Sequence, residues 1–222
     1  MLRSFSMLHL LLLATVAVAS MLGDAPAGTQ ATVTFTLDFP NSQPEHYAIR
    51  VQTDGAGRYE STGSLGADPE QGDNSDLGFT LTAPTEQKIF KLAARAGYFQ
   101  QDVDSHKKLA FTGKKTLGYK DAQRTGESTY NYSLNGAVQE LTALMQGLAS
   151  TLEVGRRLDF DRRYQKLALD EELKRMEEMA RSHDLVEVTV IQPILEQIGA
   201  DPSIINVTRA RAQRLLQGAG VR

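Results

Sequence analysis

The spacing of the apolar residues changes near Asn135-Gly136, and this change constrains the fold more than any other feature. Before that point, short runs alternate apolar and polar residues; after it, apolar residues recur three and four positions apart. Alternation is typical of strands with one buried face, and the longer spacing is typical of helices. The sequence therefore predicts an α+β fold, with a sheet-based region at 31–134 followed by a helical region at 135–222.

The first region is expected to form a mainly antiparallel sheet of about six strands with one helix. Its clearest strand is 32–39, where threonines alternate with buried-type residues of high strand preference. Further strand signals lie at 47–51, 58–62, 79–81, 109–112, 116–120 and 128–134, with a tight turn at 112–115. The glycine- and acid-rich stretch 63–78 is expected to be a long exposed loop. Thr85 should cap a helix that ends at Gly97.

The second region is expected to form a bundle of three to four helices. One helix should run from Val138 to a stop near Gly155, and a second through 160–180. Leu185–Ile191 is ambiguous: its valines alternate as in a strand, yet its apolar residues also fit a helix interrupted at Pro193, and the helical surroundings favour the helix. The last helix is expected to be capped by Asp201.

The first 19 residues have the three parts of a cleavable secretory signal peptide. Arg3 precedes an apolar run at 8–18, and Ala17-Val18-Ala19 matches the small-x-small cleavage pattern. An uncleaved anchor would need about 20 apolar residues, more than this run provides, and no cysteine follows for lipidation. We therefore expect a soluble periplasmic or extracellular chain that begins at Ser20, has a flexible lead-in at 20–30 and has no stable membrane anchor.

The absence of cysteine means that packing alone must hold this fold, without disulfides, thiol nucleophiles or thiolate metal sites. An exported chain without disulfides fits a bacterial envelope. Loss of Arg3 leaves 23 Lys+Arg against 27 Asp+Glu, a net charge of −4, which argues against a nucleic-acid partner.

No spacing in the chain predicts a catalytic, cofactor or metal site. The remaining histidines, His46, His106 and His183, are too far apart for ligand motifs. The closest approach to a serine-hydrolase elbow, 62–66, lacks its first glycine. The acids between 68 and 76 lack the order of a calcium loop and indicate a solvated segment.

Charge is segregated along the sheet region. Residues 54–86 contain seven acids and one base, whereas residues 88–124 contain nine bases and three acids. If folding brings the two stretches together, their charges neutralise each other; if they stay apart, the basic one could meet an anionic partner. The residues of this possible anionic-partner surface are Lys107, Lys108, Lys114, Lys115, Lys120 and Arg124.

Several segments carry a resemblance to predicted exported bacterial proteins for which no activity is known. These segments are Gly113–Leu117, Tyr130–Ser133, the helical run Leu141–Leu158 and Asp201-Pro202-Ser203. The resemblance implies a bacterial envelope setting, and it transfers no cofactor and no catalytic residue.

Three functions remain open. The first is a non-enzymatic interaction module that binds an envelope protein or an anionic surface. The second is an envelope hydrolase whose site is assembled from scattered residues, such as a serine or the pair Asp159 and Asp161. The third is a small-ligand carrier with a pocket lined by Tyr47, Tyr59, Tyr130 and Tyr132. The absence of any catalytic spacing favours the interaction module.

Overall fold

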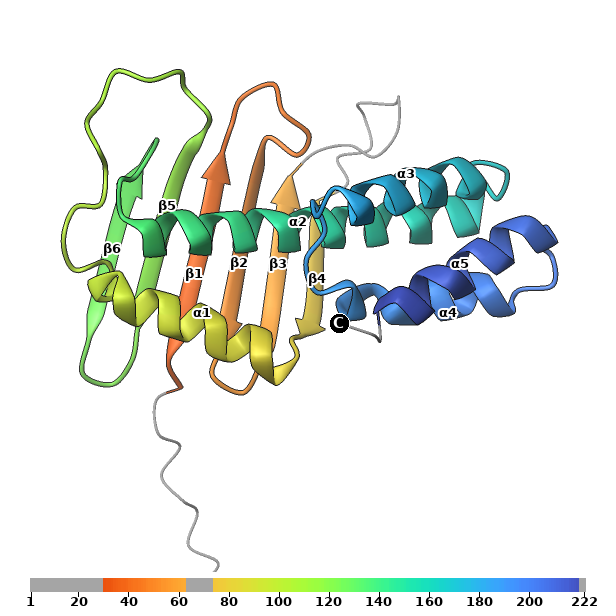
Figure 1. The fold of residues 1–222 in the computed structure, drawn as a ribbon, viewed down its shortest axis with the longest axis horizontal. Coiled ribbons are helices and arrows are strands. Elements are labelled where there is room, and N and C mark those ends of the chain that lie inside the picture. Colours follow the sequence, from red (N-terminus) through yellow and green to blue (C-terminus); the bar gives the residue numbers. More distant parts are fainter. Residues whose placement is uncertain (1–29, 63–73, 220–222) are drawn as a thin grey trace, which may run out of the picture.

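The protein consists of a helix-covered sheet that continues on one side into a lobe made only of helices (Figure 1). The structure, a computed structural model, describes residues 30–62 and 74–219. The expected signal peptide and most of the glycine-rich stretch lie outside these residues. Within the described ranges, no helix is both long and apolar enough to cross a membrane.

The sheet has six strands, all paired antiparallel, in the order β4-β3-β2-β1-β5-β6. This confirms the predicted α+β class with about six strands followed by a helical region. The strands are β1 (Thr32–Asp38), β2 (His46–Gln52), β3 (Ala56–Thr62), β4 (Ser75–Thr80), β5 (Lys114–Lys120) and β6 (Thr125–Tyr130).

The expected strand at 109–112 and tight turn at 112–115 are wrong. Residues 101–113 form no strand, and β5 begins at Lys114, opposite the last residue of β1, Asp38. The segment does not pair with the free edge of β6; Asn131 and Tyr132, which follow β6, hold its backbone. The last predicted strand, 128–134, is displaced along the chain, since β6 begins at Thr125 and ends at Tyr130.

One face of the sheet is covered by α1 (Ala83–Arg95) and by the first half of α2 (Gly136–Tyr164) (Figure 1). Every second residue of the strands points toward these helices and is buried between the sheet and the helices. Phe35 lies between Ile49 of β2 and Leu117 of β5, and all three are almost fully buried. The threonines of β1 lie on the opposite face, so the period-two pattern is reproduced residue by residue.

Helix α1 begins earlier than Thr85. Its N-cap is Thr82, and Pro84 occupies the first turn, where a proline loses no hydrogen bond. The helix ends at Arg95, and Gly97 then adopts φ 68°, a left-handed conformation that a glycine accepts without strain. The short turn η1 (Gly97–Phe99) follows and buries Phe99.

Helix α2 does not stop at Gly155 but continues to Tyr164, 29 residues in all. The Asn135 side chain caps it by accepting from the backbone N–H groups of Ala137, at 2.9 Å, and Val138. A Cβ on Gly155 would lie 2.4 Å from Cγ2 of Ile191. The glycine therefore allows another segment to approach the helix, and it does not end it.

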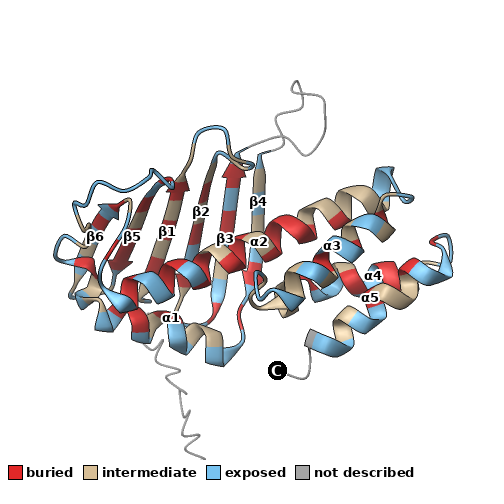
Figure 2. Cartoon of the chain, turned by 45° about the horizontal axis from the view of Figure 1, so that its top comes forward, coloured by how far each residue is buried: buried red, intermediate tan, exposed pale blue. Residues whose placement is uncertain are grey.

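The helical lobe comprises the end of α2 with α3 (Leu169–Arg181), α4 (Gln192–Ala200) and α5 (Asn206–Ala219). Its core is separate from that of the sheet and contains Leu158, Leu173, Met176, Leu195 and Ile198. The first core includes α2 as far as Leu152, and the second begins at Val154. Buried residues occur along α2 both over the sheet and in the helical lobe (Figure 2). One helix therefore belongs to both cores.

Two expectations for the lobe need correction. Leu185–Ile191 is neither a strand nor a full helix: only Val188–Ile191 is helical, as the short turn η2, and Pro193 lies in the first turn of α4. Asp201 follows α4 and accepts a hydrogen bond from the Ser203 N–H at 2.9 Å, so it stabilises the turn between helices, and α5 starts at Asn206.

Candidate functional site

Exposed lysines and exposed apolar side chains gather on the segment that follows η1 and ends at the first residue of β5, which we call the lysine loop (residues 101–114). It rises beyond the ends of the strands at the sheet end of the molecule (Figure 1). Every residue from His106 to Thr112 is exposed. The loop carries Lys107, Lys108 and Lys114 and, between them, the exposed apolar side chains of Leu109 and Phe111.

Hydrogen bonds to the chain that follows β6 hold the backbone of this loop. The side-chain oxygen of Asn131 accepts from the Thr112 N–H at 3.0 Å, and its amide group donates to the Ala110 carbonyl at 3.1 Å. The Ser105 N–H donates to the Tyr132 carbonyl at 2.8 Å. The loop is therefore anchored on both sides of its exposed apex.

Two aspartates fix the beginning of the loop. Asp104 accepts from the backbone N–H groups of His106, at 2.7 Å, and Asn131, at 2.9 Å. Asp102 accepts from the Asp104 N–H and lies 2.8 Å from Nε2 of His106, contacts that hold the pKa of Asp102 below its usual value. Both carboxylates are thus engaged within the loop and its anchor.

Lys115 lies beneath the loop and is 6 % exposed. Its ammonium group donates to the carbonyls of Thr112, Gly113 and Asn131 at 3.0–3.2 Å and to the Thr112 hydroxyl at 2.9 Å. Burial lowers the pKa of Lys115, because a dry environment disfavours the charged form. Lys115 therefore secures the base of the loop and offers no charge at the surface.

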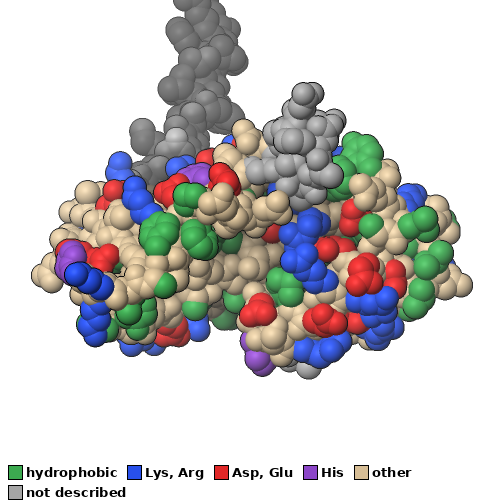
Figure 3. All heavy atoms as spheres, turned by 90° about the horizontal axis from the view of Figure 1, so that it is seen from above, with side chains coloured by type: hydrophobic (Ala, Val, Ile, Leu, Met, Phe, Trp, Pro, Cys, Tyr) green, Lys and Arg blue, Asp and Glu red, His purple; other side chains and the backbone are tan. Residues whose placement is uncertain are grey.

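The exposed apolar side chains form a patch with the lysines. Leu109 is 49 % exposed and Phe111 57 %, and the Phe111 ring meets the Phe39 ring edge-on at 5.9 Å. Tyr132 and Leu134, just after β6, are also exposed. Seen from above, hydrophobic and basic side chains lie together over this end of the molecule (Figure 3).

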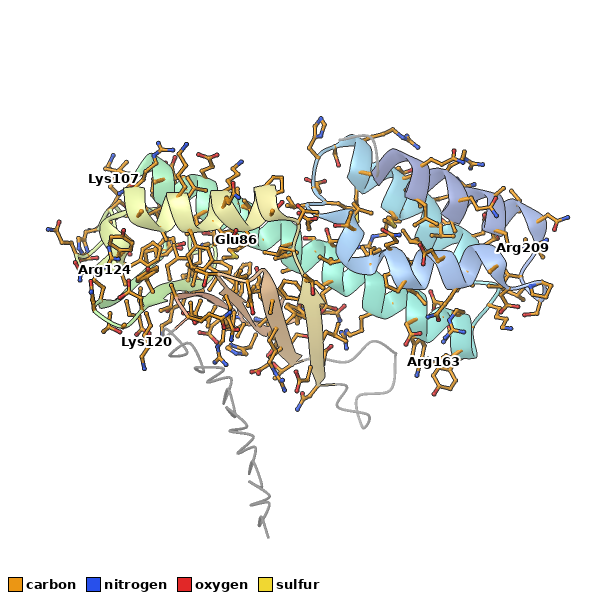
Figure 4. All side chains as sticks on the ribbon, turned by 90° about the horizontal axis from the view of Figure 1, so that it is seen from below. Glu86, Lys107, Lys120, Arg124, Arg163 and Arg209 are labelled. Carbon is orange, nitrogen blue, oxygen red and sulfur yellow. The ribbon has the colours of Figure 1, made fainter. Side chains whose placement is uncertain are left out.

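The remaining residues of the predicted anionic-partner surface lie elsewhere. Lys120 is at the opposite end of β5 from Lys114, about 20 Å away along the strand. Arg124 donates to Asp121 at 3.0 Å and lies over the Tyr98 ring at 4.2 Å. Lys107, Lys120 and Arg124 share the sheet end of the molecule, opposite Arg163 and Arg209 (Figure 4). The structure thus brings together Lys107, Lys108 and Lys114.

The charge segregation persists in the described part of the fold. There, no ion pair joins an acid of 54–86 to a base of 88–124: Arg58 pairs with Glu60 and Asp76, and Lys88 pairs with Glu140 of α2. Strands β2 and β1 separate β3 from β5 by about 14 Å. Within residues 30–62 and 74–219, Lys107, Lys108 and Lys114 have no carboxylate partner.

A cleft of about 820 Å³ lies where the start of α1 meets the helical lobe. Apolar side chains from Leu185, Val188 and Leu215 line it together with ionic ones. Among the latter, Glu187 accepts from the Thr82 hydroxyl at 2.9 Å, and Glu177 is paired with Arg211 and Arg214. Only the structure reveals this cleft, because its walls come from distant parts of the chain.

The aspartate pair proposed for a hydrolase does not face one site, whereas three of the four tyrosines proposed for a carrier lie in one core, with the Tyr47 and Tyr59 rings 5.9 Å apart. Asp159 is engaged by Arg162 and Arg163, and Asp161, two positions away on α2, points to another side of the helix. Tyr47, Tyr59 and Tyr130 are buried in the first core, whereas Tyr132 is exposed.

A buried carboxylate that the sequence analysis missed joins the sheet to α2. Oε1 of Glu153 accepts from the hydroxyls of Tyr59, at 2.6 Å, and Ser61, at 2.9 Å, and Oε2 accepts from Arg156 at 2.9–3.0 Å. The Glu153 side chain is 8 % exposed, and burial raises the pKa of Tyr59 far above its ordinary value. Its oxygens are satisfied by these donors, which indicates a structural clasp between two layers.

The sequence did hold a signal for the lysine loop. Leu109 and Phe111 stand between two pairs of lysines, Lys107-Lys108 and Lys114-Lys115. The alternation of the apolar residues predicts a strand, whereas the lysines on both sides indicate an exposed segment. Comparison of the chain with models of protein families and with curated proteins found no match.

Proposed function

We propose that the protein is an exported, non-enzymatic interaction module that docks on an anionic partner through its lysine loop. The observation that carries this proposal is the placement of three exposed ammonium groups, without carboxylate partners in the described chain, around the exposed side chains of Leu109 and Phe111. Exposed apolar side chains beside unpaired charge of one sign are typical of interaction sites.

The anchoring of the loop supports the same proposal. A loop that becomes ordered only on binding loses conformational entropy at that step. The backbone of the lysine loop is already held by hydrogen bonds that Asn131 and Asp104 accept and that Lys115 donates. The lysine side chains themselves remain free to adjust. Such a site can accept an extended anionic surface without refolding.

The test uses the mature chain, residues 20–222, and two soluble polyanions, polyglutamate and dextran sulfate. K107Q/K108Q/K114Q should weaken binding about tenfold, because three exposed ion pairs contribute about 0.5 kcal/mol each. The matched control R50Q/K91Q/R175Q removes three exposed charges outside the loop and outside the cleft, and should change the affinity little. Equal weakening by both triple variants would show unspecific attraction and overturn the proposal.

A second candidate function, that of a small-ligand carrier, rests on the cleft between α1 and the helical lobe. Its apolar wall and its arginines suit a small amphipathic anion. The probe is anilinonaphthalene sulfonate, an apolar dye with one sulfonate group. One-to-one binding that V188D/L215D abolishes and L109S/F111S leaves intact would support the carrier; dye binding unaffected by V188D/L215D would refute it.

A further inference from the structure

We infer that the anionic partner of the lysine loop is the surface of a phospholipid bilayer, with Leu109 and Phe111 entering the zone between headgroups and acyl chains. This inference rests on the proposed function and names the partner. Charge alone would suit any polyanion. The apolar side chains at the apex of the loop distinguish a bilayer from the others.

The apex of the loop exposes apolar side chains, and a hydrated polyanion has no apolar surface on which they could be buried. Leu109 and Phe111 are about half exposed, in a stretch of seven consecutive exposed residues that projects beyond the strand ends (Figure 1). A protein partner would need a concavity that matches this projection. A bilayer accepts projecting apolar side chains wherever they meet it, and burying them there is favourable.

The flanking residues suit the headgroup layer. Lys107, Lys108 and Lys114 are lysines, whose ammonium groups are point charges without the fixed fork of arginine, and their stems can lie along apolar surface while the charge stays in water. Tyr132, 40 % exposed beside the loop, belongs to the residue types that prefer the membrane interface. Apolar tips surrounded by lysines are thus matched to both layers.

Among the described residues, the acids near the loop contact other groups and form no ion pair with its exposed lysines. Asp102 and Asp104 are engaged by backbone N–H groups and His106. Asp38 stands across from Lys114 in the β1–β5 register, but its carboxylate lies 2.6 Å from Nδ1 of His46. Lys115, the remaining cation at the site, is directed into the loop.

The far end of the molecule provides a contrast. Tyr164 and Leu167 at the turn between α2 and α3, and Ile205 and Val207 before and within α5, are also exposed apolar residues. Two cations beside them are paired, Arg163 with Asp159 and Lys166 with Asp201, and a third, Arg209, donates to the side-chain oxygen of Asn206. An apolar surface without unpaired lysines should bind an anionic bilayer far less well, so this tip is an internal control.

The chain contains no tryptophan, so one introduced tryptophan reports on one place. F111W, and L109W as a second reporter in case the first disturbs the contact with Phe39, probe the loop; L167W probes the helical tip. Each folded variant is mixed with vesicles of phosphatidylcholine alone or with phosphatidylglycerol. We expect a blue shift of the loop reporters, and quenching by brominated lipid, only with the anionic vesicles; L167W should not respond.

Two further variants separate charge from insertion. K107Q/K108Q/K114Q in the F111W background should reduce vesicle affinity about a hundredfold, since each lysine near an anionic membrane contributes about a fivefold factor. L109S/F111S should reduce sedimentation with the vesicles roughly tenfold or more and leave the affinity for polyglutamate unchanged.

The outcomes distinguish this inference from the proposed function. If the protein binds polyglutamate but neither loop reporter shifts to the blue in anionic vesicles, the inference of a bilayer partner is wrong, and an acidic macromolecule remains as the partner. An equal response of L167W would also overturn it, since contact would not be specific to the loop. Failure to bind either polyanions or vesicles would overturn both proposals.

Discussion

The hydroxyl of Tyr59 in β3 donates a 2.6 Å hydrogen bond to the carboxylate of Glu153 in α2, 94 positions later in the chain. Glu153 stands between Leu152, the last α2 residue of the first core, and Val154, the first of the second. The bond therefore fastens α2 to the sheet at the point where the helix passes from one core to the other.

Removing this carboxylate should destabilise the protein strongly. E153A removes the acceptor of the buried Tyr59 and Ser61 hydroxyls, so we expect a loss of about 2–5 kcal/mol in the free energy of unfolding. Y59F removes one hydrogen bond to a charged group and should cost about 1.5–3 kcal/mol. Urea denaturation measures both, and E178A, at an exposed position of α3, is the control. A loss within about 0.5 kcal/mol for E153A would contradict the clasp.

Stability should fall at alkaline pH because of the buried tyrosines. Burial raises the pKa of Tyr130 to about 12, so the folded protein keeps this proton at pH values where the unfolded chain, with a pKa of 10.0, releases it. The contribution is complete below pH 10 and is lost as the pH rises toward 12, on the order of 2–3 kcal/mol. Urea denaturation of Y130F across this range should show a shallower decline; an unchanged slope would refute the assignment.

Gly126 should not tolerate a side chain. A Cβ there would lie 2.2 Å from the Tyr98 carbonyl oxygen and 2.9 Å from the Gln100 nitrogen, so the backbone of η1 or β6 would have to move. We expect G126A to cost about 1–3 kcal/mol, the range for overpacking. The matched control is G78A on the edge strand β4, where nothing lies within 4 Å, and it should be neutral or stabilising. Thermal unfolding compares them.

Replacing Lys115 should loosen the lysine loop without unfolding the sheet. K115M fills similar space but leaves the carbonyls of Thr112, Gly113 and Asn131 without their shared donor. Amide hydrogen exchange should accelerate in residues 102–113 and remain unchanged in β1 and β2. Uniform acceleration would mean that Lys115 supports the whole fold, and no acceleration would mean that the loop is held by Asn131 and Asp104 alone.

Export can be tested on the secreted product itself. If residues 1–19 are a cleaved signal peptide, the intact mass of the protein from the envelope or the culture medium should correspond to a chain that begins at Ser20. The cleavage site is checked with A17L/A19L, which removes the small-x-small pattern and should leave the precursor uncleaved. A mature product that still contains Met1 would refute export by this route.

The local patterns predicted the sheet well. The alternation at 32–39 marks one polar and one apolar face, and β1 has those two faces; the character change at Asn135 coincides with the cap of α2. These elements could be predicted because period and capping depend on neighbouring residues.

The errors have tertiary causes. Gly155 is a typical helix-ending residue, but here it lies inside α2 and leaves room for the side chain of Ile191, which is 36 positions away. The alternation of Leu109 and Phe111 resembles a strand, but the backbone beside them bonds to the Asn131 side chain, which comes from a distant part of the chain. The candidate site could be predicted only in part for the same reason. The lysines can be read from the sequence, but the burial of Lys115 against Asn131 and the contact of Arg124 with the Tyr98 ring arise only on folding.

The passage of α2 through both cores has a consequence for how the protein can be divided. Every cut between residues 137 and 163 breaks α2, the single helix that contributes Leu148 to one core and Leu158 to the other, and the first core also packs against Val186 and Val190 from beyond this helix. Calorimetry should therefore record one heat-absorption peak. Recombination between genes could therefore exchange the whole chain, but it could not transfer either lobe alone as an independently folding unit.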